Sequence, residues 1–68
     1  MNEENIVKKL GVATSSAIHF FIDRNCAGII RSLNNLEKHG LIKVVEVHYS
    51  SGVKRLYMTE EIYENYFN

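Results

Sequence analysis

The sequence predicts a small α+β domain with the element order α-α-α-β-β-α, spanning residues 1–68 as one unit. Three observations lead to this prediction. Apolar residues recur at helical spacing through most of the first 39 residues. Two β-branched and aromatic runs follow, separated by Ser50-Ser51-Gly52. The helical pattern of residues 26–39 ends at Gly40 and leads directly into the first of these runs, so the helix and the hairpin must be neighbours.

Length and composition limit the class of protein. A chain of 68 residues buries only about 60% of its unfolded surface, so it needs a compact helical core, a partner, or both. No apolar run approaches the roughly 20 residues of a membrane span, and the acidic N-terminus is unlike a secretory signal. The one cysteine, Cys26, cannot form an intramolecular disulfide. We therefore expect a cytoplasmic protein that does not associate with membranes.

The first helix is expected to begin at Asn2 or Glu3 and to end at Leu10, because Gly11 follows. Its inward-facing residues are predicted to be Ile6, Val7 and Leu10. A second helix should start near Thr14-Ser15-Ser16, where hydroxyl groups can accept hydrogen bonds from free backbone N–H groups. It should end before Asp23-Arg24-Asn25, after burying Ala17, Ile18, Phe21 and Ile22.

The third helix is predicted over about residues 26–39. Its core face consists of Ile29, Ile30, Leu33 and Leu36, which follow the i, i+3, i+4, i+7 pattern. Gly40 is expected to adopt the left-handed conformation that commonly ends a helix, which allows Leu41 and Ile42 to fold back onto it.

The hairpin is predicted from strands over residues 42–49 and 53–58. In the return strand, Leu56 and Met58 should face one side, with Arg55 and Tyr57 on the other. Thr59 can cap a last helix over residues 60–66, whose first turn holds two acidic residues. Helices packed against a two-stranded hairpin are the small structure that such short connections allow.

Charge is distributed unevenly although the formal net charge is zero. All eight basic residues lie between Lys8 and Arg55, and that span holds three acidic residues, which leaves an excess of five positive charges. The remaining acids lie near the two ends. This asymmetry can place a basic surface on a neutral protein, although acids are also favoured in the first turns of helices.

The residues on the outer face of the third helix indicate that a basic surface there would bind DNA. Arg31 and Lys38 lie opposite the core face, and small residues near the helix start let a backbone approach a groove closely. Asparagine can bind adenine through two atoms, and arginine can do the same with guanine. We expect base contacts from Arg31, Asn34, Asn35, Ala27 and Gly28. We expect phosphate contacts from Arg24, Lys38, Lys54, Arg55 and Ser15, with Lys43 at the base of the hairpin.

A family resemblance rests on two segments. The first ends in Leu36-Glu37-Lys38-His39-Gly40-Leu41-Ile42, and the second is Arg55-Leu56-Tyr57-Met58-Thr59-Glu60-Glu61. Over about residues 14–61 the chain resembles the winged helix-turn-helix transcriptional regulators of prokaryotes and their viruses, in particular the MarR and ArsR group. The resemblance implies a three-helix core with a hairpin wing, a third helix in the major groove of duplex DNA, and a two-fold dimer.

The chain differs from that family in two respects. Its segment Asp23-Arg24-Asn25-Cys26 stands where the family usually has a small residue and a hydroxyl cap, and it lacks the long extra helices that dimerise larger members. Residues 8–16 also resemble the turn of a plain helix-turn-helix, which would make residues 15–22 the recognition helix. That alternative is disfavoured because Phe20, Phe21 and Ile22 are too apolar to read a groove.

The last helix carries an apolar stripe of Ile62, Tyr63, Tyr66 and Phe67. These four large side chains exceed what so small a core needs. We predict that part of the stripe forms a homodimer interface with Ile6 and Val7 of the first helix. The alternative is that the stripe covers only the core of its own domain.

The leading functional hypothesis is a DNA-binding transcription regulator, a dimer on a short palindrome, with no cofactor and no small-molecule effector. The alternative is a winged-helix protein-interaction module, favoured by zero net charge and the aromatic tail. Duplex RNA fits less well because its deep major groove excludes a helix. An enzyme is not expected, since the sequence holds no glycine-rich phosphate loop and no Ser-His-Asp set.

Metal binding is not expected either, because His19, His39, His48 and Cys26 lack the close spacing of a zinc site. Cys26 lies near a helix N-terminus, where the pKa of a thiol can fall and permit redox sensing. A small, buried apolar role for Cys26 is the favoured interpretation.

Overall fold

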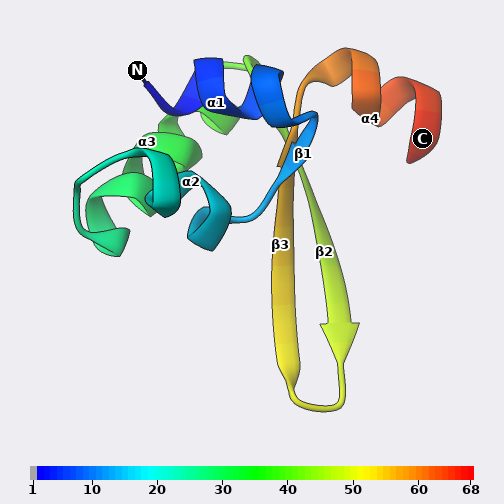
Figure 1. The fold of residues 1–68 in the computed structure, drawn as a ribbon. Coiled ribbons are helices and arrows are strands. Elements are labelled where there is room, and N and C mark those ends of the chain that lie inside the picture. The colour runs from blue at the N-terminus through cyan, green and yellow to red at the C-terminus, as the bar shows by residue number, and fades with distance from the viewer. Residues whose placement is uncertain (1) are drawn as a thin grey trace.

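The computed structural model describes residues 2–68, which fold into four α-helices and a three-stranded antiparallel sheet. The elements are α1 (Glu3–Leu10), β1 (Val12–Ala13), α2 (Ser15–Phe21), α3 (Cys26–Lys38), β2 (Lys43–Tyr49), β3 (Gly52–Met58) and α4 (Glu60–Tyr66). In Figure 1, α1, α2 and α3 gather beside the base of the sheet, the β2–β3 hairpin extends away from them, and α4 projects on the other side. The predicted α+β class is confirmed.

The helices begin at residues whose side chains cap them, which confirms the caps predicted near Thr14 and at Thr59 and adds two that the sequence analysis did not predict, Asn2 and Asn25. Each capping side chain accepts a hydrogen bond from the backbone N–H three residues further along the chain. The capping residues are Asn2, Thr14, Asn25 and Thr59. Because these bonds satisfy N–H groups that have no partner inside the helix, they fix where each helix starts.

The end of α3 also follows the prediction. Gly40 has a φ of 76°, in the left-handed region that favours glycine. The N–H of Gly40 donates to the carbonyl of Glu37 at 3.0 Å, and that of Leu41 donates to the carbonyl of Leu36 at 2.9 Å. These two bonds form a Schellman motif. Ile42 then folds back into the core, whereas Leu41 stays exposed, contrary to expectation.

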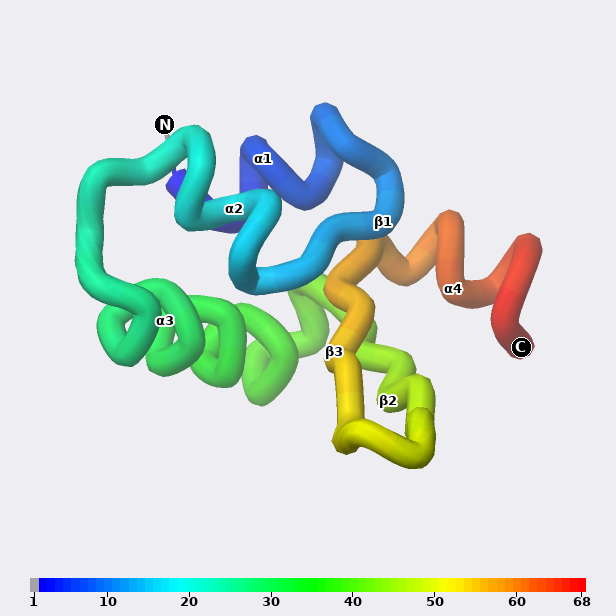
Figure 2. The backbone as a smooth tube through the Cα atoms, turned by 60° about the horizontal axis from the view of Figure 1, so that its bottom comes forward, coloured from blue at the N-terminus to red at the C-terminus, as the bar shows by residue number. Residues whose placement is uncertain are grey.

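The expectation of a two-stranded sheet must be corrected, because a third strand joins the hairpin. β1 pairs with β3, Val12 opposite Met58 and Ala13 opposite Tyr57, which gives the sheet order β1-β3-β2. A strand of two residues is too short to show an alternating pattern, so the sequence did not reveal it. Figure 2 shows that β1 attaches the α1–α2 connection to β3, which fixes the hairpin relative to the helices.

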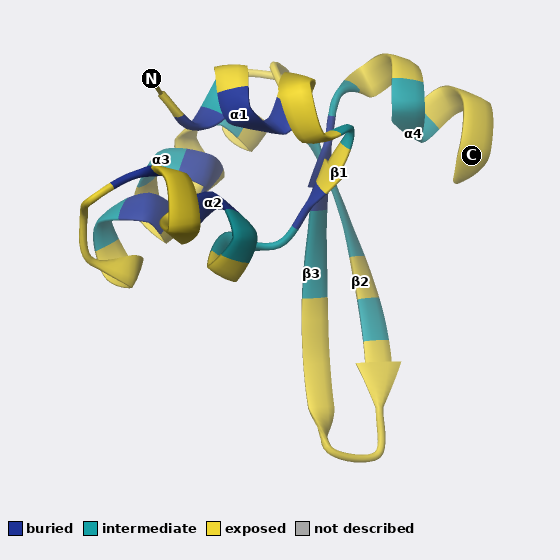
Figure 3. Cartoon of the chain, viewed as in Figure 1, coloured by how far each residue is buried: buried dark blue, intermediate teal, exposed yellow. Residues whose placement is uncertain are grey.

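The hairpin is buried at its base and exposed at its tip (Figure 3). Tyr49 lies opposite Gly52, so Ser50 and Ser51 form a two-residue loop. Tyr57 and Met58 are both buried at the base, although successive residues of a strand point to opposite faces. The far half of the hairpin therefore contributes little to the core and is available to a partner.

One core joins the helices to the base of the sheet. It consists of Ile6, Val7, Ala13, Ile18, Ile22, Ile29, Leu33, Ile42 and Tyr57. Four residues expected inside are exposed instead: Leu10, Phe21, Ile30 and Leu41. Leu10 and Phe21 are the last residues of α1 and α2, and Leu41 follows the end of α3, where the core no longer covers the chain. Ile6 and Val7 are fully buried in this core, so they cannot join a dimer interface as we expected.

Candidate nucleic-acid interface

The surface best suited to nucleic acid is the outer face of α3 with the adjoining side of the hairpin. Ala27, Arg31, Asn34 and Lys38 are exposed and follow one another at spacings of four, three and four residues. Residues at these spacings are neighbours on a helix, so they form one stripe along α3, which we call the α3 stripe. Asn35 is exposed beside it, so most of the predicted base-reading residues share one accessible face.

Gly28 has a structural role in this helix. Its N–H donates to Oδ1 of the capping residue Asn25 at 2.7 Å, and a Cβ on Gly28 would lie 3.2 Å from that oxygen. Gly28 is only partly exposed. A larger side chain would crowd the cap, so the glycine is explained without any contact to a base.

Three cations on α3 and β3 have no ion-pair partner within residues 2–68. Within residues 2–68, Arg31, Lys38 and Lys54 are exposed and take part in no ion pair. Arg31 and Lys38 belong to α3, and Lys54 lies on β3 near the tip of the hairpin. They can therefore contact an anionic ligand without first breaking an internal salt bridge.

Arg55, which we expected at a phosphate, is instead engaged inside the chain. Its Nη1 donates to Oδ1 of Asn34 at 3.4 Å, and its Nη2 lies 3.6 Å from Oε1 of Glu37. Its Nε lies 3.9 Å from Oε2 of Glu46, and the guanidinium carbon lies 5.7 Å from the centre of the Tyr57 ring. Glu37 of α3 and Glu46 of the neighbouring strand β2 thus flank Arg55, and we no longer assign it to phosphate.

Arg24 is likewise engaged within the chain. It pairs with the carboxylate of Glu3, whose side chain is 3% exposed, and Oγ of Ser32 donates to the same carboxylate at 3.1 Å. A buried carboxylate requires such partners, because its desolvation is costly when it is left alone. Arg24 therefore has a structural role in place of the expected phosphate contact.

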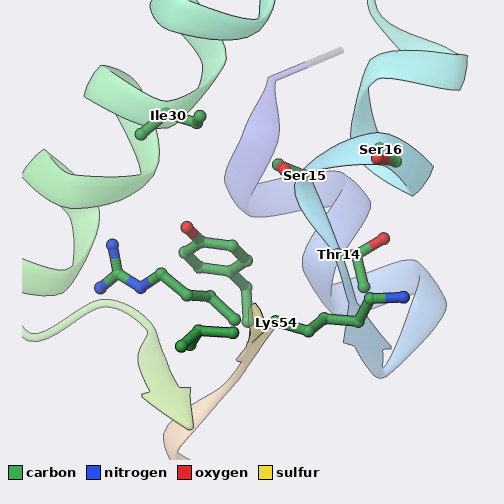
Figure 4. A pocket seen from close by; sticks show the side chains of 8 residues that line it. Thr14, Ser15, Ser16, Ile30 and Lys54 are labelled. Atoms are coloured by element: carbon green, nitrogen blue, oxygen red, sulfur yellow. The ribbon is translucent and has the colours of Figure 1, made fainter. Parts of the chain in front are cut away.

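A cavity of about 290 Å³ lies between the start of α2, the middle of α3 and β3. The hydroxyl-bearing residues Thr14, Ser15 and Ser16 line one side of it, as Figure 4 shows. Lys54 and Ile30 line it as well. Ser15 and Lys54, both of which we expected to contact phosphates, therefore line the same cavity. Ile30, which we expected in the core, also lines this cavity.

The ring of Tyr57 lies beside the guanidinium of Arg55. Burial raises the pKa of its phenol above the ordinary value of 10.0, the nearby Arg55 lowers this pKa, and Glu37 raises it. The phenol is therefore neutral and its ring supports the guanidinium of Arg55.

The apolar stripe of α4 is divided between the domain and the surface. Ile62 and Tyr63 are partly buried, and Nζ of Lys43 lies 5.9 Å from the centre of the Tyr63 ring. Tyr66 is 76% exposed, and Phe67 is also exposed. Only the outer part of this stripe is thus free for another molecule.

Sequence reasoning missed a second apolar surface, on α2. Phe20 is 86% exposed, and its ring meets that of Phe21 edge to face with centroids 5.7 Å apart. Phe20 lies two positions after the buried Ile18, and residues at this spacing lie on different sides of a helix. Its apolar character alone gave no sign that it would be exposed.

The chemistry expected of Cys26 must be revised. Cys26 is exposed at the first position of α3, so the favoured expectation of a buried apolar role is wrong. Within α3, the first residue that belongs to the core is Ile29, so Cys26 lies outside it. Among the described residues 2–68, no group of three or more His, Cys, Asp or Glu side chains could hold a metal ion.

Comparison with known proteins gives no family for this chain. No protein-family profile, no curated protein sequence and no solved structure matches it. In residues 2–68, no helix is both long and apolar enough to cross a bilayer. Function is therefore inferred from the charges, exposure and geometry described above.

Proposed function

We propose that the protein is a sequence-specific, double-stranded DNA-binding transcription regulator with a winged helix-turn-helix fold. In this proposal α3 lies in the major groove and the β2–β3 hairpin is the wing. The α3 stripe carries the proposal, because it combines on a single exposed face one amide, one small residue and two cations that take part in no ion pair within the described residues 2–68. Arginine and asparagine donors on a helix are suited to the edges of bases in that groove.

The hairpin provides additional support for the proposal, because it carries a further exposed cation, Lys54. β1 pairs with β3 at the base of the hairpin, and the exposed Lys54 lies further along β3, where it lines the cavity between α2, α3 and β3. We assign phosphate contacts to Lys38, Lys54 and Ser15, which would set the register without reading sequence. The internal ion pairs leave Arg24 and Arg55 out of this set.

We propose further that the regulator is a homodimer joined through the outer part of α4. Tyr66 and Phe67 are exposed on a helix that projects from the body of the domain. A two-fold axis through this helix would present two α3 stripes to one duplex, and the operator would then be a short palindrome.

A protein-interaction module is the second candidate, because a fold alone does not determine function. The exposed Phe20 and its edge contact with Phe21 favour it, since exposed aromatic clusters commonly mark binding surfaces. The salt dependence of binding distinguishes the two candidate functions. DNA binding weakens steeply as salt rises, whereas docking through aromatic rings does not.

The test is a gel shift on DNA fragments from around the protein's own gene, at two salt concentrations. A discrete shifted band that survives unrelated competitor DNA and weakens with salt supports the regulator. Arg31→Ala should lose the band, whereas Lys9→Ala should keep it, because Lys9 is exposed on α1 away from the α3 stripe. A smear that any competitor removes would favour the interaction module.

A further inference from the structure

We propose that Arg55 is a positioning residue that fixes the base preference of Asn34. Arg55 holds the amide of Asn34 so that its donor end faces the groove, which suits guanine in place of adenine. This inference rests on the proposed function, and it alters the role that the sequence suggests for Asn34.

The contacts of Arg55 span two elements. Its Nη1 lies 3.4 Å from Oδ1 of Asn34, although the two residues are 21 positions apart in the chain. Its Nη2 and Nε face Glu37 of α3 and Glu46 of β2, at 3.6 Å and 3.9 Å. The one hydrogen bond of the guanidinium is therefore the bond to Asn34, the two carboxylates contribute charge at longer distances, and the hairpin is joined to the outer side of α3.

The guanidinium is surrounded by groups that favour its observed position. The side chain of Arg55 is 35% exposed, and the ring of the buried Tyr57 lies 5.7 Å from its guanidinium carbon. Ion pairs with two carboxylates and support from an aromatic ring restrict the rotation of the side chain. A DNA phosphate would have to compete with these two carboxylates for Arg55.

The chemistry of this contact fixes the orientation of Asn34. A guanidinium has donors and no acceptor, so the amide oxygen of Asn34 must face Arg55 and the amide nitrogen must face away. Contact with adenine through two atoms requires Asn34 to accept from the N6 amino group as well as to donate to N7. The second lone pair of Oδ1 lies beside a positive charge, which repels an approaching N–H donor.

Guanine suits the orientation that remains. Its major-groove edge presents two acceptors, N7 and O6, and no donor. The free amide N–H groups of Asn34 can donate to these acceptors while its oxygen stays bonded to Arg55. A substitution that removes the guanidinium would release the oxygen and restore the contact with adenine.

Selection of binding sites from random duplexes tests the inference with the wild-type chain, Arg55→Met and Asn34→Ala. We expect the wild type to prefer guanine at one position of each half-site, and Arg55→Met to shift that position toward adenine by about fivefold or more in relative affinity. Asn34→Ala should lose the preference at the same position only. Arg55→Lys should keep part of the guanine preference, because an ammonium also only donates.

The controls separate this inference from the proposed function. Lys54→Met should weaken binding to all sequences without changing any preference. If Arg55→Met does not fold, Arg55→Leu provides the same test, because a leucine side chain also has no donor for the amide oxygen of Asn34. An unchanged preference in the folded Arg55 variants, or a preference that Asn34→Ala leaves intact, would overturn the inference. Failure of the wild type to select any sequence would instead contradict the proposed function.

Discussion

The hydroxyl of Ser32 in α3 donates to Oε1 of Glu3 in α1 at 3.1 Å, although 29 positions separate the two residues. Arg24, which precedes α3, pairs with the same carboxylate. The buried carboxylate of Glu3 thus has partners from two further parts of the chain. This cluster joins α1 to the helix that carries the α3 stripe, and its loss should loosen the proposed reading surface.

Arg24→Ala should lower the free energy of unfolding by about 1–3 kcal/mol, because it leaves a buried carboxylate without its cation. Urea denaturation measures the change. Lys8→Ala is the matched control, since it breaks the exposed pair between Lys8 and Glu4, and such pairs contribute about 0.5 kcal/mol or less. Equal losses in the two variants would show that the Glu3 cluster does not stabilise the fold.

Arg31→Ala should weaken DNA binding by about 1–3 kcal/mol and relax specificity at one position of the site. The reason is that Arg31 is an exposed, unpaired donor in the middle of the α3 stripe. Equilibrium titrations of a matched duplex and of single-mismatch duplexes measure both effects. An equal loss on every duplex would mean that Arg31 contacts a phosphate and reads no base.

Lys54→Ala should weaken binding to all sequences alike and reduce the slope of log affinity against log salt by about one, because one phosphate contact disappears. Titrations at several salt concentrations provide that slope. Lys9→Ala, the control on α1, should leave it unchanged. A slope that is the same in the Lys54 variant and the wild type would remove Lys54 from the interface.

The wild-type chain should sediment as a dimer at high micromolar concentration, and Tyr66→Glu should sediment as a monomer. Tyr66 is exposed on α4, so a charge there should prevent self-association without disturbing the core. Circular dichroism checks that the variant is folded. A wild-type chain that sediments as a monomer at this concentration would contradict the proposed dimer.

Stability should decline at high pH because of Tyr57. Its folded-state pKa is raised by burial, so the neutral phenol stabilises the fold below the ordinary pKa of 10.0. That contribution is lost as the pH rises through the raised pKa. Arg55→Met removes a charge that lowers this pKa, so it should raise the pKa further, which an ultraviolet titration of phenolate measures. A lower pKa in the variant would contradict the described Arg55–Tyr57 contact.

Local sequence signals predicted the helices well, because their ends depend on neighbouring residues. The predicted capping residues Thr14 and Thr59 lie three residues from the N–H groups that they satisfy, and Gly40 ends α3 through its own backbone conformation. These interactions span a few positions and are visible in the sequence. The winged-helix assignment, in contrast, stays a proposal.

Interactions between distant residues could not be predicted in this way. The pairing of β1 with β3 joins Val12 to Met58, and the Arg24–Glu3 pair joins the α2–α3 connection to α1. Both arginines that we expected at phosphates are held by carboxylates from other elements. A basic residue near the third helix or the hairpin can therefore be assigned to phosphate only when its ion pairs within the protein are known.

The most direct test of the central claim is fluorescence anisotropy with a labelled duplex, chosen by selection or from around the gene, in the presence of excess unrelated DNA. Titrations of the wild type and Arg31→Ala at two salt concentrations complete the measurement. We predict saturable binding by the wild type that weakens as salt rises, and a clear loss of affinity in the Arg31 variant. Binding that unrelated DNA abolishes, or that Arg31→Ala leaves unchanged, would contradict sequence-specific recognition through α3.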